Sequence, residues 1–296
     1  MSGRTVWFPG HMAKGERKLG ELLEKLDLII EVRDARAPFS TSSPLIETIA
    51  KLKPVVLVLS KKDLADPART AVWINEFAQR GAYSKTRRND VDGRGAFNDT
   101  AWAFDLRKDN LAPLRKFLLL LSPPHRELRV AVIGIPNVGK SMFLNTLVSK
   151  SRAKVGGIPG ITRNVSWYKG GGFLAVDSPG ILDPHAEPGV HRVLSWLGCA
   201  KAEVIGGHEA AALELITFLR ERGLWSVVGN KWGIEELDEL PGETLSRIGR
   251  RLGCLIAGGA IDMELAGKRL LDSFASGKLG AVTLELPGDP LWTKRN

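Results

Sequence analysis

The chain is poor in cysteine and has no long hydrophobic run, and each shortage excludes a class of protein. Its 296 residues include 2 cysteines, Cys199 and Cys254, without metal-ligand spacing, so neither a disulfide framework nor a zinc site is predicted. The longest apolar runs, such as 117–121, fall far short of the ~18–20 residues of a membrane span. The first residues contain no hydrophobic region of a signal peptide, so we expect a cytoplasmic protein.

The sequence has fewer acidic than basic residues. It contains 42 Lys and Arg residues against 33 Asp and Glu residues, which leaves a formal net charge of +9. This excess favours a polyanionic partner without naming one. The hydrophobic content of 44% is that of a globular protein, and the length suits one large domain and one smaller domain.

The first half of the chain alternates between apolar runs and amphipathic segments. Strands are predicted at 28–33, 54–59 and 101–106, and helices at 44–52, 68–80 and 111–121. This alternation is typical of βαβ units on a parallel sheet, where ligands bind at the carboxyl ends of the strands. The charged stretch 83–100 interrupts it. A solvated loop is the favoured interpretation of that stretch, and an RNA-contacting arm is the alternative.

A phosphate-binding loop is predicted near the middle of the chain, at residues 134–141, which read Gly-Ile-Pro-Asn-Val-Gly-Lys-Ser. It follows the apolar run 129–133 and precedes the start of a helix, and this is the context that a P-loop requires. Its backbone N–H groups would surround phosphate oxygens. Lys140 would reach the terminal phosphates, and the Ser141 hydroxyl would bind Mg²⁺.

Three residues after the P-loop fit the metal and the terminal phosphate of a P-loop nucleotidase. The predicted strand 173–176 ends at Asp177, a residue type that holds Mg²⁺ through water at this place. Gly180 can offer its N–H to a γ-phosphate, and Thr162 lies on a loop long enough to close over the metal. Each feature is weak alone, but their order after a P-loop is specific.

A base-reading element lies before the P-loop. The segment Ser60-Lys61-Lys62-Asp63 follows the predicted strand 54–59 and has the form [NT]-K-x-D except at its first residue. A carboxylate such as that of Asp63 accepts the N1–H and N2–H₂ groups of guanine and is repelled by the N1 lone pair of adenine. Ser60 stands where Asn is usual, and a hydroxyl makes only part of the hydrogen bonds of an amide.

In this order of motifs the chain resembles the circularly permuted GTPases, and more closely the bacterial ribosome-biogenesis GTPase A (YlqF) family. The matching segments follow the family order and span nearly the whole chain, at 8–14, 34–38, 134–141, 159–162, 177–181 and 253–259. The resemblance implies an α/β fold in which a circularly permuted Ras-like P-loop GTPase domain, residues 1–182, precedes a mostly helical domain, residues 183–296.

The resemblance also implies the activity and the partners. It indicates a GTPase with low intrinsic activity that acts in assembly of the large ribosomal subunit, binds a precursor in the GTP state and is released after hydrolysis. The helical domain would contact ribosomal RNA, and we expect a monomer that uses GTP and Mg²⁺. The fifth GTPase element aligns near Asp105 and Leu106 but is not recognisable there.

The predicted site therefore gathers residues from both sides of the P-loop. The residues assigned to nucleotide binding are Ser60, Lys61, Asp63, Asp105, Leu106, Asn137, Val138, Gly139, Lys140, Ser141, Met142, Thr162 and Gly180. Mg²⁺ is assigned to Ser141, Thr162 and Asp177, and catalysis to Lys140 and His11.

The group that orients the attacking water has more than one candidate. Ile181 stands where Ras-like proteins carry Gln, and its side chain can neither donate nor accept a hydrogen bond. The resemblance assigns this task to His11, whereas the residues alone favour a histidine that packs or caps near the start of the chain. Asn137 is associated with K⁺ in related GTPases, or it bonds its own loop. Arg36 is another candidate cation, or it pairs with Asp34.

The last third of the chain contains no second chemical motif, which favours a docking role. Helices are predicted at 190–197, 210–222, 242–252 and 262–277, and a short strand at 281–286. Basic residues recur on these helices, and an RNA-facing surface and ordinary solvated helix faces fit them equally. Two other functions stay open for the whole chain, a P-loop ATPase and an RNA-binding scaffold with a weak or vestigial nucleotide site.

Overall fold

The computed structural model describes residues 23–79, 101–148, 153–155, 167–178, 180, 182–183, 186–234 and 239–289. These residues form two compact units, one of residues 23–183 with 285–289 and one of residues 186–284. The domain boundary that the sequence predicts, after residue 182, stays a prediction. His11, Thr162 and the stretch 83–100 lie outside the described residues. Within the described ranges, no helix is long and apolar enough to cross a membrane.

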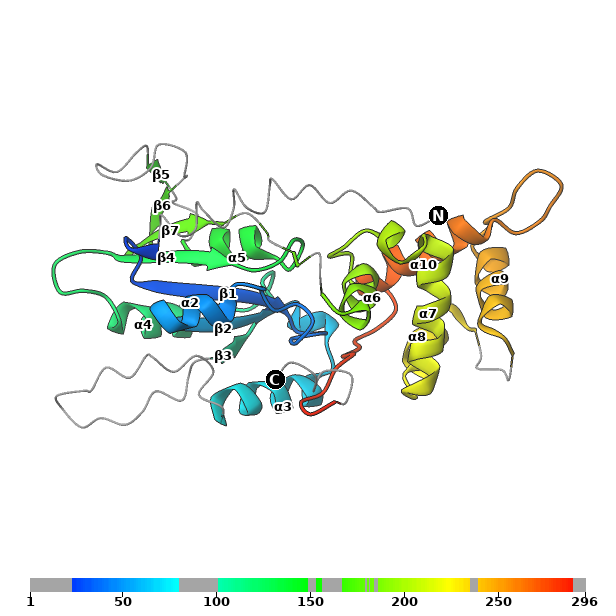
Figure 1. Ribbon diagram of the computed structural model, residues 1–296, viewed down its shortest axis with the longest axis horizontal. Helices are drawn as coiled ribbons and strands as arrows, with labels where there is room; N and C mark the ends of the chain where they lie inside the picture. Colours follow the sequence, from blue (N-terminus) through cyan, green and yellow to red (C-terminus); the bar gives the residue numbers. More distant parts are fainter. Residues whose placement is uncertain are drawn as a thin grey trace. The chain divides into compact units, whose positions relative to one another are not determined.

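The first unit is built on a single sheet (Figure 1). Its strands are β1 (Leu28–Asp34), β2 (Val55–Ser60), β3 (Ala101–Ala103), β4 (Leu128–Ile133), β5 (Ala153–Val155), β6 (Trp167–Gly170) and β7 (Phe173–Asp177). The order across the sheet is β3-β2-β1-β4-β7-β6-β5. The strands from β3 to β7 in that order are parallel, and β6 and β5 continue the sheet antiparallel. The predicted parallel α/β sheet is therefore confirmed.

The strands β1 and β2 are buried along their whole length, and this includes three charged residues of β1, namely Glu31, Arg33 and Asp34. The helices of this unit are α2 (Ile46–Leu52), α3 (Pro67–Gln79), α4 (Ala112–Leu120) and α5 (Lys140–Leu147), with the 3-10 turn η1 (Lys62–Leu64). One core cluster joins α2 to β1, β2, β4, β6 and β7. A second cluster packs Trp73 of α3 against Leu57 and Leu59 of β2.

The strand register brings separate sequence segments to one edge of the sheet. Asp34, the last residue of β1, pairs with Ser60, the last residue of β2. Val132 of β4 pairs with Asp177, the last residue of β7. Because these strands are parallel, the segments that follow them emerge at the same edge. This is the edge where α/β sheets bind their ligands.

The second unit is helical. It contains α6 (Pro188–Trp196), the 3-10 turn η2 (Ala202–Ile205), α7 (His208–Glu221), α8 (Trp225–Trp232), α9 (Pro241–Arg251) and α10 (Met263–Ala275). Glu264 of α10 accepts hydrogen bonds from the N–H groups of His208 and Glu209 and so caps the start of α7. All four predicted helices are confirmed within a few residues, whereas α8 was not predicted.

The segment 281–286 is not a strand, so that prediction is wrong. Its alternating sequence suggests a strand, but its polar groups form hydrogen bonds with residues outside any neighbouring strand. The Glu285 carbonyl accepts a hydrogen bond from the Trp73 indole at 2.9 Å. The Glu285 carboxylate accepts hydrogen bonds from the N–H groups of Phe39 and Ser40. The chain thus returns to the first unit after its helical part.

Candidate functional site

The P-loop has the strand, loop and helix arrangement that its sequence predicts. It leaves β4 after Ile133, and α5 begins at Lys140. Gly134 has a φ of 148°, and a Cβ there would lie 2.4 Å from the Val32 carbonyl oxygen. Gly139 has a φ of 96° at the start of α5. Glycine is therefore required at both positions, by close packing at the first and by the left-handed backbone at the second.

The side chains of the P-loop divide into buried and exposed ones. Val138 is fully buried and anchors the loop in the core, whereas Met142 is exposed. Lys140 is 8% exposed, and its Nζ donates a hydrogen bond to the Ile135 carbonyl at 2.7 Å. The lysine thus folds back over its own loop, where a nucleotide phosphate would lie. Asn137 is exposed and has a φ of 62°.

Two of the three residues predicted to hold Mg²⁺, Ser141 and Asp177, lie together. The Ser141 hydroxyl donates a hydrogen bond to Asp177 Oδ2 at 2.8 Å. The other carboxylate oxygen, Asp177 Oδ1, is buried and has no hydrogen-bond partner among the described residues. A buried carboxylate oxygen without a donor suits a hard cation that takes oxygen ligands. The side chains present therefore fit the proposed ion.

Gly180 lies against the P-loop. A Cβ at this residue would lie 2.8 Å from the Pro136 nitrogen and 3.0 Å from Lys140 Nζ. The P-loop backbone and the Lys140 side chain therefore fill the space beside Gly180. The assignment of Gly180 to a γ-phosphate stays a prediction.

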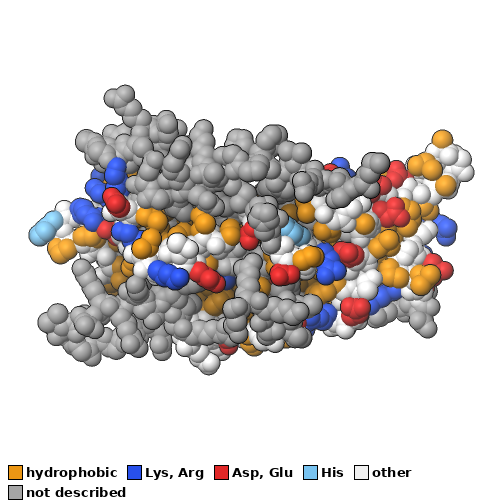
Figure 2. Space-filling view, viewed as in Figure 1, with side chains coloured by type: hydrophobic (Ala, Val, Ile, Leu, Met, Phe, Trp, Pro, Cys, Tyr) orange, Lys and Arg blue, Asp and Glu red, His pale blue; other side chains and the backbone are white. Residues whose placement is uncertain are grey.

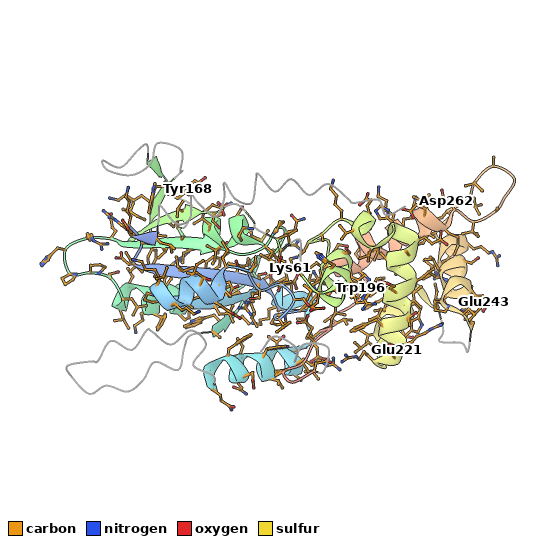
Figure 3. The ribbon with its side chains drawn as sticks, in the orientation of Figure 1. Lys61, Tyr168, Trp196, Glu221, Glu243 and Asp262 are labelled. Carbon is orange, nitrogen blue, oxygen red and sulfur yellow. The ribbon has the colours of Figure 1, made fainter. Side chains whose placement is uncertain are left out.

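The predicted base-reading segment begins at the end of β2. Ser60 is fully buried, and its hydroxyl lies within hydrogen-bond distance of the Arg33 and Val138 carbonyl oxygens. Lys61, labelled in Figure 3, has a left-handed backbone with a φ of 55°. Asp63 lies in η1 and is exposed. Its carboxylate is therefore accessible to a ligand.

The loop after β3 completes this side of the site. The Lys62 N–H donates to the Phe104 carbonyl, so the loop lies next to the base-reading segment. The Leu106 side chain lies 3.5 Å from the position that a Cβ on Gly139 would take. The Asp105 carboxylate accepts a hydrogen bond from the Arg107 N–H within its own turn. Leu106, one of the two residues aligned with the fifth element, thus lies next to the P-loop, and Asp105 lies in the adjoining turn.

A buried ion cluster, which the sequence only hinted at, lies beneath the base-reading segment. Arg36 is 1% exposed, and its guanidinium contacts both carboxylate oxygens of Asp34. The interpretation of Arg36 as the local partner of Asp34 is therefore confirmed. Lys61 Nζ lies 2.9 Å from Asp34 Oδ2. Burial opposes ionisation of Asp34, but the charges and hydrogen bonds of Arg36 and Lys61 hold its pKa well below the usual range.

Two members of the predicted site lie outside the described residues, namely His11 and Thr162. The other members come together from segments that are far apart in the sequence. The P-loop, the ends of β1, β2 and β7 and the loop after β3 surround one edge of the sheet. The fold and this arrangement define a P-loop nucleotide-binding protein whose base-reading segment precedes the P-loop.

Comparisons with known proteins identify the family. The model of the 50S ribosome-binding GTPase family matches residues 129–218. A ribosome biogenesis GTPase A from Bacillus pumilus is 35% identical over 283 residues, covering 95% of this chain and 98% of that protein. A mitochondrial ribosome-associated GTPase 1 from Mus musculus is 31% identical, covering 94% of this chain and 89% of that protein.

A solved structure agrees with these relatives. The crystal structure of GNP-bound YlqF from Thermotoga maritima matches with a TM-score of 0.64 and 27% identity, covering 93% of this chain and 99% of that one. The chain belongs to the ribosome biogenesis GTPase A family, and it is a GTPase with the circularly permuted fold.

Proposed function

We propose that this chain assists assembly of the large ribosomal subunit, binding a precursor in its GTP form and leaving after hydrolysis. The observation that carries the nucleotide assignment is the junction of Ser60 and Val138, which attaches the base-reading segment to the P-loop. Asp63 follows Ser60 by three residues, so this contact supports a base site at the same edge of the sheet as the P-loop. The ribosomal relatives support the choice of partner.

Each proposed residue has a defined task. The P-loop N–H groups and Lys140 bind the phosphates, Ser141 and Asp177 hold Mg²⁺, and Gly180 donates its N–H to the γ-phosphate. Mg²⁺ supplies charge neutralisation between the phosphates when it is bound. Thr162 is assigned to the same metal. The family resemblance supports His11 as the residue that orients the attacking water, since the Ile181 side chain has no polar atom.

A second cation is proposed at Asn137. Its exposed side chain on the left-handed turn of the P-loop provides an amide oxygen, which is a ligand type suited to K⁺. Such an ion would supply positive charge where other GTPases use an arginine. Arg36 does not offer that charge, because it is buried against Asp34.

The helical unit is proposed as the surface that contacts ribosomal RNA. Arg247 is paired with Glu239, but several other basic residues of this unit are exposed, among them Arg250, Arg251, Lys268, Arg269 and Lys278. Acidic side chains lie between basic ones on the face seen in Figure 2. This mixture of charges favours contacts with individual phosphates over binding by a continuous basic patch. We propose that the protein works in the cytoplasm as a monomer.

The deciding experiment is GTP turnover with and without purified large ribosomal subunits, in K⁺ and in Na⁺. We expect slow hydrolysis alone, marked stimulation by subunits, and faster turnover in K⁺. Stimulation without a K⁺ effect would remove Asn137 from the proposal and keep the ribosomal partner. Equal affinity for GTP and ATP would favour a P-loop ATPase. Absence of hydrolysis with subunits and K⁺ present would favour a scaffold with a vestigial site.

A further inference from the structure

The base-reading turn contains an unusual backbone conformation. Lys61 has a φ of 55°, and among the described residues only Asn137 is another non-glycine residue with positive φ. A side chain on such a backbone is strained, so the surrounding structure must hold it in place. Lys61 directly precedes η1, which carries Asp63. Whatever holds Lys61 therefore also sets the start of the turn that presents the Asp63 carboxylate.

Asp34 is the residue that contacts the Lys61 side chain. The two strands that carry these residues end side by side, because Asp34 and Ser60 are register partners and the Ala35 N–H donates to the Ser60 carbonyl. The next residue, Lys61, turns back, and its Nζ reaches Asp34 Oδ2 at 2.9 Å. Lys61 is 24% exposed at its side chain, whereas Asp34 is fully buried. A buried anion thus holds a partly exposed lysine.

Asp34 is itself fixed from several directions. Its Oδ1 accepts hydrogen bonds from the Arg36 N–H and Nε, and its Oδ2 lies 2.8 Å from Arg36 Nη2. Its N–H donates to Thr41 Oγ1, which in turn donates to the Ala37 carbonyl. The charge of Arg36 keeps Asp34 ionised despite its burial. The carboxylate is thus a rigid anchor that stays available to Lys61.

From this geometry we infer that Asp34 is a positioning residue for base recognition, which holds the Lys61–Asp63 turn through its ion pair with Lys61. The inference rests on the proposed GTP site. Asp34 does not contact the nucleotide in this arrangement. Its removal leaves the P-loop, Lys140 and the metal ligands in place, so it affects the base-dependent part of binding and not the phosphate-dependent part.

The test compares the affinities of GTP and ATP for the full chain by competition against a fluorescent GDP analogue. Asp34→Asn keeps the shape of the side chain and an acceptor for the Arg36 N–H, but it replaces Oδ2 with a donor that repels Lys61. We expect the preference for GTP over ATP to fall about tenfold or more, since the base is then read by an unanchored carboxylate. ATP affinity, which depends on the phosphates, stays near the wild-type value.

Glu31→Gln is the matched control. Glu31 is on the same strand, is fully buried and pairs with Arg33 at 2.7 Å, and its carboxylate accepts a hydrogen bond from the Ser43 N–H. This variant also loses a buried ion pair next to the loop after β1, but it leaves the Lys61 contact intact. It should lower stability and keep the wild-type preference for GTP.

Two variants of Lys61 decide the question if Asp34→Asn does not fold. Lys61→Met keeps the length of the side chain and removes its charge, so the preference should fall as in Asp34→Asn. Lys61→Arg keeps a partner for Asp34, so the preference should be largely retained. An unchanged preference in Lys61→Met, or in a folded Asp34→Asn, would overturn the inference. A wild-type protein without any preference for GTP would instead overturn the proposed function.

Discussion

The Ser60 hydroxyl lies 2.5 Å from the Val138 carbonyl oxygen and 2.9 Å from the Arg33 carbonyl oxygen. A hydroxyl has one proton, so at any moment it donates to one of these two backbone acceptors. Ser60 is fully buried, so its hydroxyl proton bonds to the protein backbone and not to a ligand. The serine thus joins the ends of β1 and β2 to the P-loop, so in the proposed function the base is read by Asp63.

Ser60→Ala should weaken GTP and ATP binding equally. The lost hydrogen bond is worth about 1 kcal/mol, and its loss loosens the P-loop that both nucleotides share. We expect roughly a fivefold loss of affinity for each nucleotide. Ser195→Ala is a suitable control, because Ser195 is also a buried serine that donates to a carbonyl, but in the helical unit. A selective loss of GTP binding in Ser60→Ala would show that the hydroxyl reads guanine after all.

Gly180→Ala should impair GTP binding more than GDP binding. The added methyl group would meet the Pro136 nitrogen at 2.8 Å and Lys140 Nζ at 3.0 Å, so the loop and the lysine must move. Such overpacking costs about 1–3 kcal/mol. Gly242→Ala adds the same methyl group where nothing lies within 4 Å and should leave both affinities unchanged. Equal affinities for GTP in Gly180→Ala and wild type would remove this residue from the site.

Asp177→Asn should weaken the Mg²⁺ dependence of GTP binding. The variant replaces a proposed metal ligand with an amide and removes the charge of Oδ1, which is buried and has no hydrogen-bond partner among the described residues. We expect Mg²⁺ affinity to fall about tenfold or more, so GTP binding with Mg²⁺ should approach the wild-type value measured with EDTA. Asp262→Asn removes one charge from the cap of α10, where asparagine caps equally well, and should change nothing. Retained Mg²⁺ dependence in Asp177→Asn would place the ion elsewhere.

The sequence predicted the parts of the fold that depend on short segments. Strand β2 is apolar from Val55 to Leu59 and β1 begins with the apolar residues 28–30, so these runs identify both strands without knowledge of their neighbours. The P-loop is defined by residue spacing and by the strand before it. Helix α8 was missed because Gly229 disfavours a helix, whereas packing requires a glycine there: a Cβ would lie 2.5 Å from the Ile234 carbonyl oxygen.

Contacts that depend on strand register could not be predicted in the same way. The sequence suggested that Arg36 pairs with Asp34, since the two residues are close in the chain. It gave no sign that Lys61 joins them, because that contact requires β1 and β2 to end at the same level. The same holds for Ser60, whose partner Val138 is remote in sequence.

His11→Ala should lower the subunit-stimulated turnover of GTP and leave the affinity for GTP nearly unchanged. A group that orients water acts on the rate, whereas the phosphates are bound by other residues. Lys140→Ala provides the contrast, since loss of this positive charge from the P-loop should abolish nucleotide binding. Affinity and single-turnover hydrolysis should be measured on both variants. A large loss of affinity in His11→Ala would assign the histidine a structural role.

The stability of the first unit should depend on pH through Glu285. Burial raises the pKa of this carboxyl from 4.5 to about 7, and the nearby Asp289 adds to the shift, although hydrogen bonds from Ser40 and Phe39 oppose it. Between pH 4.5 and about 7, the folded protein therefore holds a proton that the unfolded chain has released. The free energy of unfolding should accordingly fall as pH rises through this range.

Glu285→Gln removes this titration and should flatten the dependence. Urea unfolding of both proteins between pH 5 and pH 8 measures the effect, and the difference between the two curves isolates the contribution of Glu285. The variant should gain stability relative to wild type as pH rises, because the wild-type protein must then bury a charged carboxylate among the N–H groups of Phe39 and Ser40. Parallel curves for the two proteins would mean that the carboxyl ionises at the same pH in the folded and unfolded states.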